Sequence, residues 1–112
     1  MPQILPELNI PSEVKNDIAL VIETLLNKFA AEIHSIILFG SYAKDKYQPD
    51  SDIDLAVVLN TLPEKKDRRA YSQAVDLDRE IDLLFCSIEQ LKSNTMVYRS
   101  IKEQGVVLYE QL

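Results

Sequence analysis

Three carboxylates in or beside apolar runs are the residues best suited to chemistry in this chain. Asp52 and Asp54 lie two residues apart at the start of the run Ile53–Leu59. In an extended segment, side chains at this spacing leave the same face, with Cα atoms about 6.5 Å apart. Asp82 lies inside another apolar run, where a carboxylate is costly unless it is paired, bound to a metal or turned to water at a strand edge. Three carboxylates about 4 Å apart would repel by about 4 kcal/mol per pair at an effective dielectric constant of about 20. The pattern therefore favours a divalent cation site.

A glycine–serine pair ahead of these carboxylates has the features of a phosphate-binding turn. Gly40 and Ser41 follow the short apolar run 35–39. Glycine lets backbone amides approach a phosphate closely, and Ser41 begins a short helical turn whose N-terminus attracts anions. Lys44 lies one turn along and either reaches the phosphates as a point charge or remains a solvated lysine. Tyr42 packs on the sheet or flanks a base, and packing is favoured.

The stretch from Gly40 to Leu55, GSYAKDKYQPDSDIDL, resembles the signature of the DNA polymerase β-like nucleotidyltransferases. That signature is G-S-x-A-x-G, a short loop, and then S-D-[IV]-D-L. Element order and length extend the similarity over about residues 13–110. The size is similar to that of the minimal nucleotidyltransferases, the partners of HEPN-domain proteins in toxin–antitoxin pairs. One residue departs from the pattern: Asp45 stands where the family has glycine, and aspartate tolerates a left-handed backbone better than most residues.

The resemblance implies a role for each of these residues. Gly40 and Ser41 would bind the phosphates of ATP, with Lys44 as a further nucleotide-binding candidate. Asp52, Asp54 and Asp82 would hold two Mg²⁺ ions and carry catalysis. Asp82 would be the general base or a ligand of the second ion. The implied reaction transfers a nucleoside monophosphate, AMP from ATP, to a hydroxyl and releases pyrophosphate.

The acceptor of the nucleotide is less determined than the site. The resemblance implies a protein acceptor, a HEPN-domain toxin, and hence a hetero-oligomer in which this chain is the antitoxin. One alternative is an antitoxin that acts by binding alone. Another is an enzyme that modifies a small molecule such as an antibiotic. The intact aspartates favour an enzyme over an antitoxin that acts by binding alone. The lack of room for an acceptor-binding domain disfavours an enzyme that modifies a small molecule.

Composition excludes several other classes of protein. One cysteine and one histidine are too few for a zinc site of ordinary composition. Cys86 is expected to be a small buried hydrophobe, and His34, just ahead of a strand, to be structural. A net charge of -6 disfavours direct nucleic-acid binding. The chain shows neither a signal peptide nor an apolar run of about 20 residues, so no membrane contact and a cytoplasmic location are expected.

The length predicts a single domain over residues 1–112, and three prolines predict an extended leader at 1–11. A helix is expected over 13–31 with Ser12 as its N-cap, and Ser87 and Gln90 form a capping-box pattern. Gly105 is expected to end the last helix. The remaining expected elements are strands at 35–39, 53–59, 79–85 and 106–109, and helices at 64–77 and 95–104. Together they predict an α+β fold, α/β in type, in which helices pack against a small mixed sheet of about four strands. The resemblance supplies the polymerase β-like topology.

The predicted helix at 64–77 opens with a charged run, EKKDRR. Such a run is usually a solvated face. The alternative is a partner-docking patch, in which Arg68, Arg69 and Tyr71 would be the contact residues because Arg and Tyr are enriched at interface hot spots.

Overall fold

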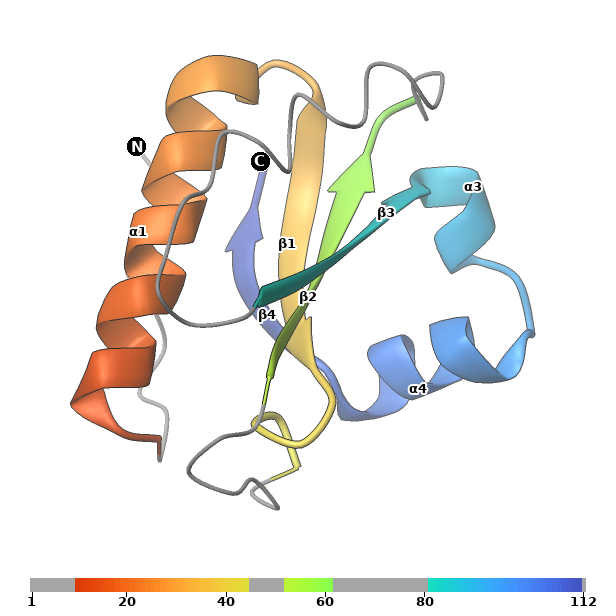
Figure 1. The fold of residues 1–112 in the computed structure, drawn as a ribbon. Coiled ribbons are helices and arrows are strands. Elements are labelled where there is room, and N and C mark those ends of the chain that lie inside the picture. The colour runs from red at the N-terminus through yellow and green to blue at the C-terminus, as the bar shows by residue number, and fades with distance from the viewer. Residues whose placement is uncertain (1–9, 45–51, 62–80, 112) are drawn as a thin grey trace.

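The computed structural model describes residues 10–44, 52–61 and 81–111, which form a mixed four-stranded sheet with helices on both faces (Figure 1). The strand order is β3-β2-β1-β4. β1 runs antiparallel to both β2 and β4, whereas β2 and β3 are parallel. The predicted fold class is therefore confirmed. The elements, in chain order, are α1 (Ser12–Phe29), β1 (Ile33–Phe39), β2 (Ile53–Leu59), β3 (Ile81–Ser87), α3 (Ile88–Leu91), α4 (Met96–Gln104) and β4 (Val106–Glu110).

Each face of the sheet has its own apolar core. In β2, Ile53, Leu55 and Val57 belong to the core that α1 covers, while Ala56 and Val58 belong to the core beside α3 and α4. This alternation follows from the two-residue period of a strand. The nearly continuous apolar run of β2, interrupted at Asp54 alone, is thus explained, because this strand is buried on both faces.

The apolar stripe on α1 packs on the sheet as its spacing predicts. The buried side chains recur at steps of three and four residues, and they are Val14, Ile18, Val21, Ile22, Leu25 and Leu26. The predicted cap at Ser12 is wrong: Pro11 is the N-cap residue, and no side chain caps the helix. The amide of Lys15 instead donates to the carbonyl of Pro11 at 3.1 Å.

The strands agree with the predictions apart from their ends. β2 has the predicted bounds, and β1 begins two residues earlier than expected. His34 therefore lies inside β1 rather than ahead of it, and it is half-buried with Nδ1 3.4 Å from the Ser35 hydroxyl. β3 continues to Ser87 and β4 to Glu110, each beyond its predicted end.

The capping box at the start of α3 is confirmed. The amide of Gln90 donates to the Ser87 hydroxyl at 3.1 Å, and the amide of Ser87 donates to Oε1 of Gln90 at 3.0 Å. Gly105 ends α4 as predicted, with its amide donating to the carbonyl of Ile101 at 2.9 Å. Its backbone is extended rather than left-handed. A Cβ at Gly105 would lie 2.6 Å from Cγ2 of Ile37, so the glycine lets α4 turn closely into β4.

Four predictions lie outside the described residues. They are the leader at residues 1–9, the helix at 64–77 with its charged run, the first two residues of the strand at 79–85, and the conformation of Asp45. Residues 10 and 11 of the predicted leader are described, and they lead directly into α1.

Candidate active site

A sharp turn follows β1 and carries the glycine–serine pair. Gly40 has φ +77°, a left-handed conformation that glycine adopts without steric cost. The amide of Lys44 donates to the carbonyl of Gly40 at 3.2 Å, which closes one turn of helical type. Ser41 is half-buried and Lys44 is exposed. Tyr42 is 4% exposed and belongs to the core beneath α1, so its packing role is confirmed.

The sheet brings two of the three carboxylates side by side. Asp54 and Asp82 are direct partners in the parallel pair of β2 and β3, whose strands lie about 4.8 Å apart. Asp52 immediately precedes β2, and strand alternation puts it on the same face as Asp54. Asp52 and Asp82 are exposed, and Asp54 is half-buried.

The glycine turn packs directly on one of these carboxylates. Phe39, the residue before the turn, is the cross-strand partner of Asp54. A Cβ built on Gly40 would collide with the Asp54 carboxylate, with its Cγ only 2.9 Å away. Gly40 thus leaves room for the Asp54 side chain, in addition to permitting the turn. The predicted nucleotide-binding pair and the predicted metal ligands therefore meet at one end of the sheet.

The carboxylates influence one another electrostatically. Burial raises the pKa of Asp54 above its ordinary value, and the negative charges of Asp82 and Asp52 raise it further. A cation between these groups would relieve that repulsion, and carboxylate oxygens are the donors that Mg²⁺ prefers. Within residues 10–44, 52–61 and 81–111, no three His, Cys, Asp or Glu side chains are already gathered as a metal site. The exposed side chains of Asp52 and Asp82 would have to turn toward Asp54, a change between staggered rotamers.

Sequence reasoning missed Phe39 as a neighbour of the site. This half-buried ring stands directly beside Asp54 and packs against the core beneath α4. A signal was present in the sequence, because Phe39 precedes the glycine turn. However, the register of β1 on β2 decides which residue faces Asp54, and no sequence pattern gave that register.

The thiol of Cys86 lies on the same face of the sheet as Asp54, but it is not reactive. Cys86 is fully buried in the core beneath α3 and α4, and burial raises the pKa of its thiol to about 11. It is therefore a small apolar side chain, as predicted.

Comparison with known proteins establishes the family. The family model described as "Polymerase beta, Nucleotidyltransferase" matches residues 20–111. The chain therefore belongs to the polymerase β-like nucleotidyltransferases, and its enzyme class is that of a nucleotidyltransferase.

In the residues that the structure describes, every helix is too short or too polar to span a bilayer.

Relatives support the same assignment. A protein of Methanocaldococcus jannaschii named "Putative protein adenylyltransferase MJ0604" is 31% identical over 98 residues, which are 79% of this chain and 90% of that protein. A crystal structure described as a toxin–antitoxin with AMP-PNP is 29% identical, with a TM-score of 0.60 over 82% of this chain and 73% of that one. The fold also matches a structure described as a tri-AMPylated Shewanella oneidensis HEPN toxin in complex with MNT antitoxin, at 23% identity and a TM-score of 0.61, over 87% of this chain and 72% of that one.

Proposed function

We propose that this chain transfers AMP from ATP to a hydroxyl of a partner protein and so acts as the antitoxin of a HEPN-domain toxin. The observation that carries the proposal is the meeting of Gly40, Asp54 and Asp82 at one end of the sheet. A phosphate-binding turn and a pair of interacting carboxylates are the two parts that nucleotidyl transfer requires. The reaction would take place in the cytoplasm.

The turn would hold the triphosphate. Gly40 presents backbone without a side chain, and the Ser41 hydroxyl is available to donate a hydrogen bond to a phosphate oxygen. Lys44 is exposed one turn away, where its ammonium group would add a positive charge near the phosphates. These groups fix the α-phosphorus for attack, and positioning of this kind supplies much of the catalysis in phosphoryl-transfer chemistry.

The carboxylates would hold two Mg²⁺ ions. When bound, the ions would neutralise charge on the phosphates and lower the pKa of the attacking hydroxyl. Asp54, the least exposed of the three, would anchor the site, with Asp52 beside it on the same strand face. Asp82 is exposed on the neighbouring strand and is the candidate either to accept the proton of the hydroxyl or to hold the second ion. A bond forms between the acceptor oxygen and the α-phosphorus. The bond from the α-phosphorus to the oxygen bridging it to the β-phosphorus breaks, and pyrophosphate leaves.

The comparisons support a protein acceptor. The relative from M. jannaschii is named as a protein adenylyltransferase, and the solved neighbours include toxin–antitoxin complexes. A small-molecule acceptor has no comparable support. The hetero-oligomer with a HEPN toxin and the use of ATP belong to this proposal.

Co-expression with the toxin partner tests the proposal. Wild-type chain with Mg²⁺ and ATP should add the mass of AMP to the partner and silence its RNase activity, and the adduct should persist after the proteins are separated. The double variant Asp52→Asn, Asp54→Asn should leave the partner unmodified and active at low antitoxin concentration. Intact-mass spectrometry and an RNase assay on the same sample give both results.

The binding-only antitoxin makes the opposite prediction. Silencing would then need stoichiometric protein, survive the double substitution and leave the mass of the partner unchanged. An unmodified but fully silenced partner would therefore replace the enzymatic proposal with the binding-only one.

A further inference from the structure

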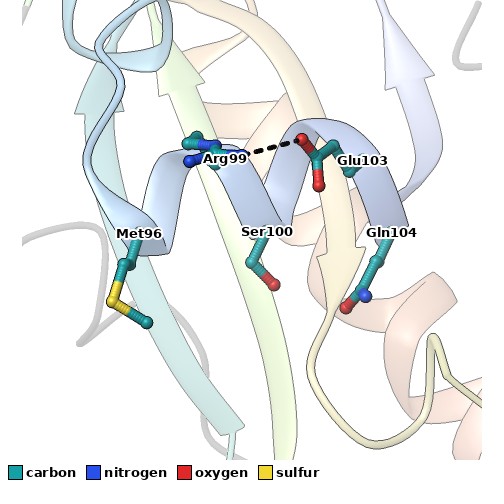
Figure 2. A pocket seen from close by; sticks show the side chains of 5 residues that line it. All are labelled: Met96, Arg99, Ser100, Glu103 and Gln104. Atoms are coloured by element: carbon teal, nitrogen blue, oxygen red, sulfur yellow. Dashed lines mark ion pairs between the residues drawn. The ribbon is translucent and has the colours of Figure 1, made fainter.

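A hollow lies along α4, the helix on the same face of the sheet as Asp54. It has a volume of about 220 Å³ and is lined by Met96, Arg99, Ser100, Glu103 and Gln104. Figure 2 shows the side chains of Met96, Ser100 and Gln104 pointing to one side of the helix. Ser100 is one turn from each of the other two, so a short side chain stands between two long ones and leaves a notch.

The strand register places the C-terminal end of α4, and with it Gln104, at the same end of the sheet as the candidate active site. Val106, at the start of β4, pairs with Leu38, and the next residue of β1, Phe39, pairs with Asp54. α4 ends at Gln104, two residues before Val106, so this end of the helix lies level with Phe39 at the carboxylate end of the sheet.

Packing keeps this arrangement in place. Ile101 of α4 is 1% exposed and belongs to the core against which Phe39 packs. Gly105 holds the end of α4 close to Ile37 of β1. Ile101 and Phe39 thus meet in one core with Ala56 and Val58 of β2, and Asp54 lies on the same face of that strand. A ligand with its phosphates at the glycine turn could extend over the Phe39 ring toward Gln104.

The size and chemistry of the hollow favour a single nucleobase, rather than a whole nucleotide, as its ligand. A volume of about 220 Å³ is below the roughly 300–1,000 Å³ of whole-ligand pockets, so an entire nucleotide would not fit. A methionine thioether makes favourable contacts with aromatic rings. A glutamine carboxamide offers one donor and one acceptor, which match the N6 and N7 edge of adenine. Arg99 is the side chain suited to guanine, but it forms an ion pair with Glu103 instead, with Nη2 3.8 Å from Oε1.

We propose that the hollow on α4 is the nucleobase subsite of this enzyme, and that Gln104 favours adenine there. The inference rests on the proposed nucleotidyltransferase function of the neighbouring carboxylates, and it adds a base-recognition role for a helix outside the sequence motif. Ser100 would provide space for the ring, and Gln104 would read its edge.

Equilibrium binding with and without a base tests the proposal. ATP, GTP and inorganic tripolyphosphate are titrated in MgCl₂ into wild type, Ser100→Phe and Gln104→Ala. Two substitutions of the same kind at exposed positions serve as controls: Ala19→Phe on α1 and Gln111→Ala just beyond β4. Ser100→Phe should weaken ATP binding about tenfold and leave tripolyphosphate binding unchanged. Gln104→Ala should lower the preference for ATP over GTP about fivefold, the low end for a bidentate base contact because the side chain is exposed. The controls should match wild type.

Three outcomes would overturn the proposal. Equal weakening of ATP and tripolyphosphate by Ser100→Phe would mean that the substitution disturbs the phosphate site. Unchanged ATP binding with weaker transfer to the partner protein would assign the hollow to the acceptor instead. An unaltered ATP-to-GTP ratio in Gln104→Ala would remove the role of Gln104. Failure of the proposed function is distinguishable. Without a nucleotide site, wild type itself would bind neither ATP nor tripolyphosphate, and without transfer it would bind ATP but leave the mass of the partner unchanged.

Discussion

Replacing Asp54 with asparagine should stabilise the metal-free protein while removing its response to Mg²⁺. Asp54 and Asp82 are partners on adjacent strands about 4.8 Å apart. Two unit charges at that distance repel by about 1 kcal/mol in water and about 3 kcal/mol at an effective dielectric constant of about 20. Asp82 is exposed, so the lower figure applies. Relief of about 1 kcal/mol corresponds to a rise of about 4 °C in the melting temperature of a chain this size.

The same repulsion gives a pH dependence with a definite sign. The pKa of Asp54 is raised in the folded state, chiefly by burial and then by Asp82 and Asp52. Between the ordinary value of 3.8 and the raised value, the folded state binds more protons than the unfolded state. The contribution of Asp54 therefore destabilises the fold above that window and disappears below it. The advantage of Asp54→Asn should shrink as the pH falls toward 4.

Thermal unfolding followed by circular dichroism measures both effects. Melts with EDTA give the metal-free stability, and melts with Mg²⁺ and ATP give the ligand response, which should be large in wild type and absent in Asp54→Asn. Glu110→Gln is the control, because Glu110 is an exposed carboxylate paired with Ser35 at the other end of β1. A lower metal-free melting temperature in Asp54→Asn would show that the carboxylate does not destabilise the fold, and an undiminished response to Mg²⁺ and ATP would show that it does not hold the metal ions.

Substitutions in the glycine turn and a labelling experiment on the core test three further properties. Gly40→Ala should abolish transfer and lower stability by about 1–2 kcal/mol, because alanine is strained at φ +77° and its Cβ would collide with Asp54; normal turnover would contradict the close packing seen here. Ser41→Ala should weaken ATP binding about tenfold, equivalent to about 1.5 kcal/mol for one hydrogen bond to a charged group, and equal affinity would deny the hydroxyl a phosphate role. The Cys86 thiol, fully buried with a pKa of about 11, should react with a thiol reagent only on unfolding in denaturant, so rapid labelling of the native protein would disprove its burial.

The sequence predicted those parts of the fold that depend on local patterns. β2 has its predicted bounds because its run is apolar apart from Asp54 and begins beside Asp52. The capping box at Ser87 and Gln90 was predicted because it lies within four residues. The cap of α1 was predicted wrongly, because the helix begins one residue earlier than expected: Pro11 is the N-cap residue, with φ −58°, and Ser12 is already inside the helix.

Properties that depend on long-range register could not be predicted from the sequence. Asp54 and Asp82 were expected to be neighbours, but only the parallel pairing of β2 and β3 makes them direct partners. The contact of Gly40 with Asp54 arises from the antiparallel register of β1 on β2. The position of Gln104 at the carboxylate end depends on the pairing of β4 with β1. In each case residues distant in sequence meet through sheet pairing, and neither periodicity nor a motif encodes the register.

Asp52, Asp54 and Asp82 together should hold the metal ions on which nucleotidyl transfer depends. A crystal grown with Mn²⁺ and a non-hydrolysable ATP analogue tests it directly, because Mn²⁺ substitutes for Mg²⁺ and is located by its anomalous scattering. We expect a peak in direct contact with carboxylate oxygens of Asp52 and Asp54, with Asp82 at the same or a second peak and the phosphates at the Gly40 turn. Nucleotide bound at that turn with Mn²⁺ coordinated by none of the three carboxylates would contradict it.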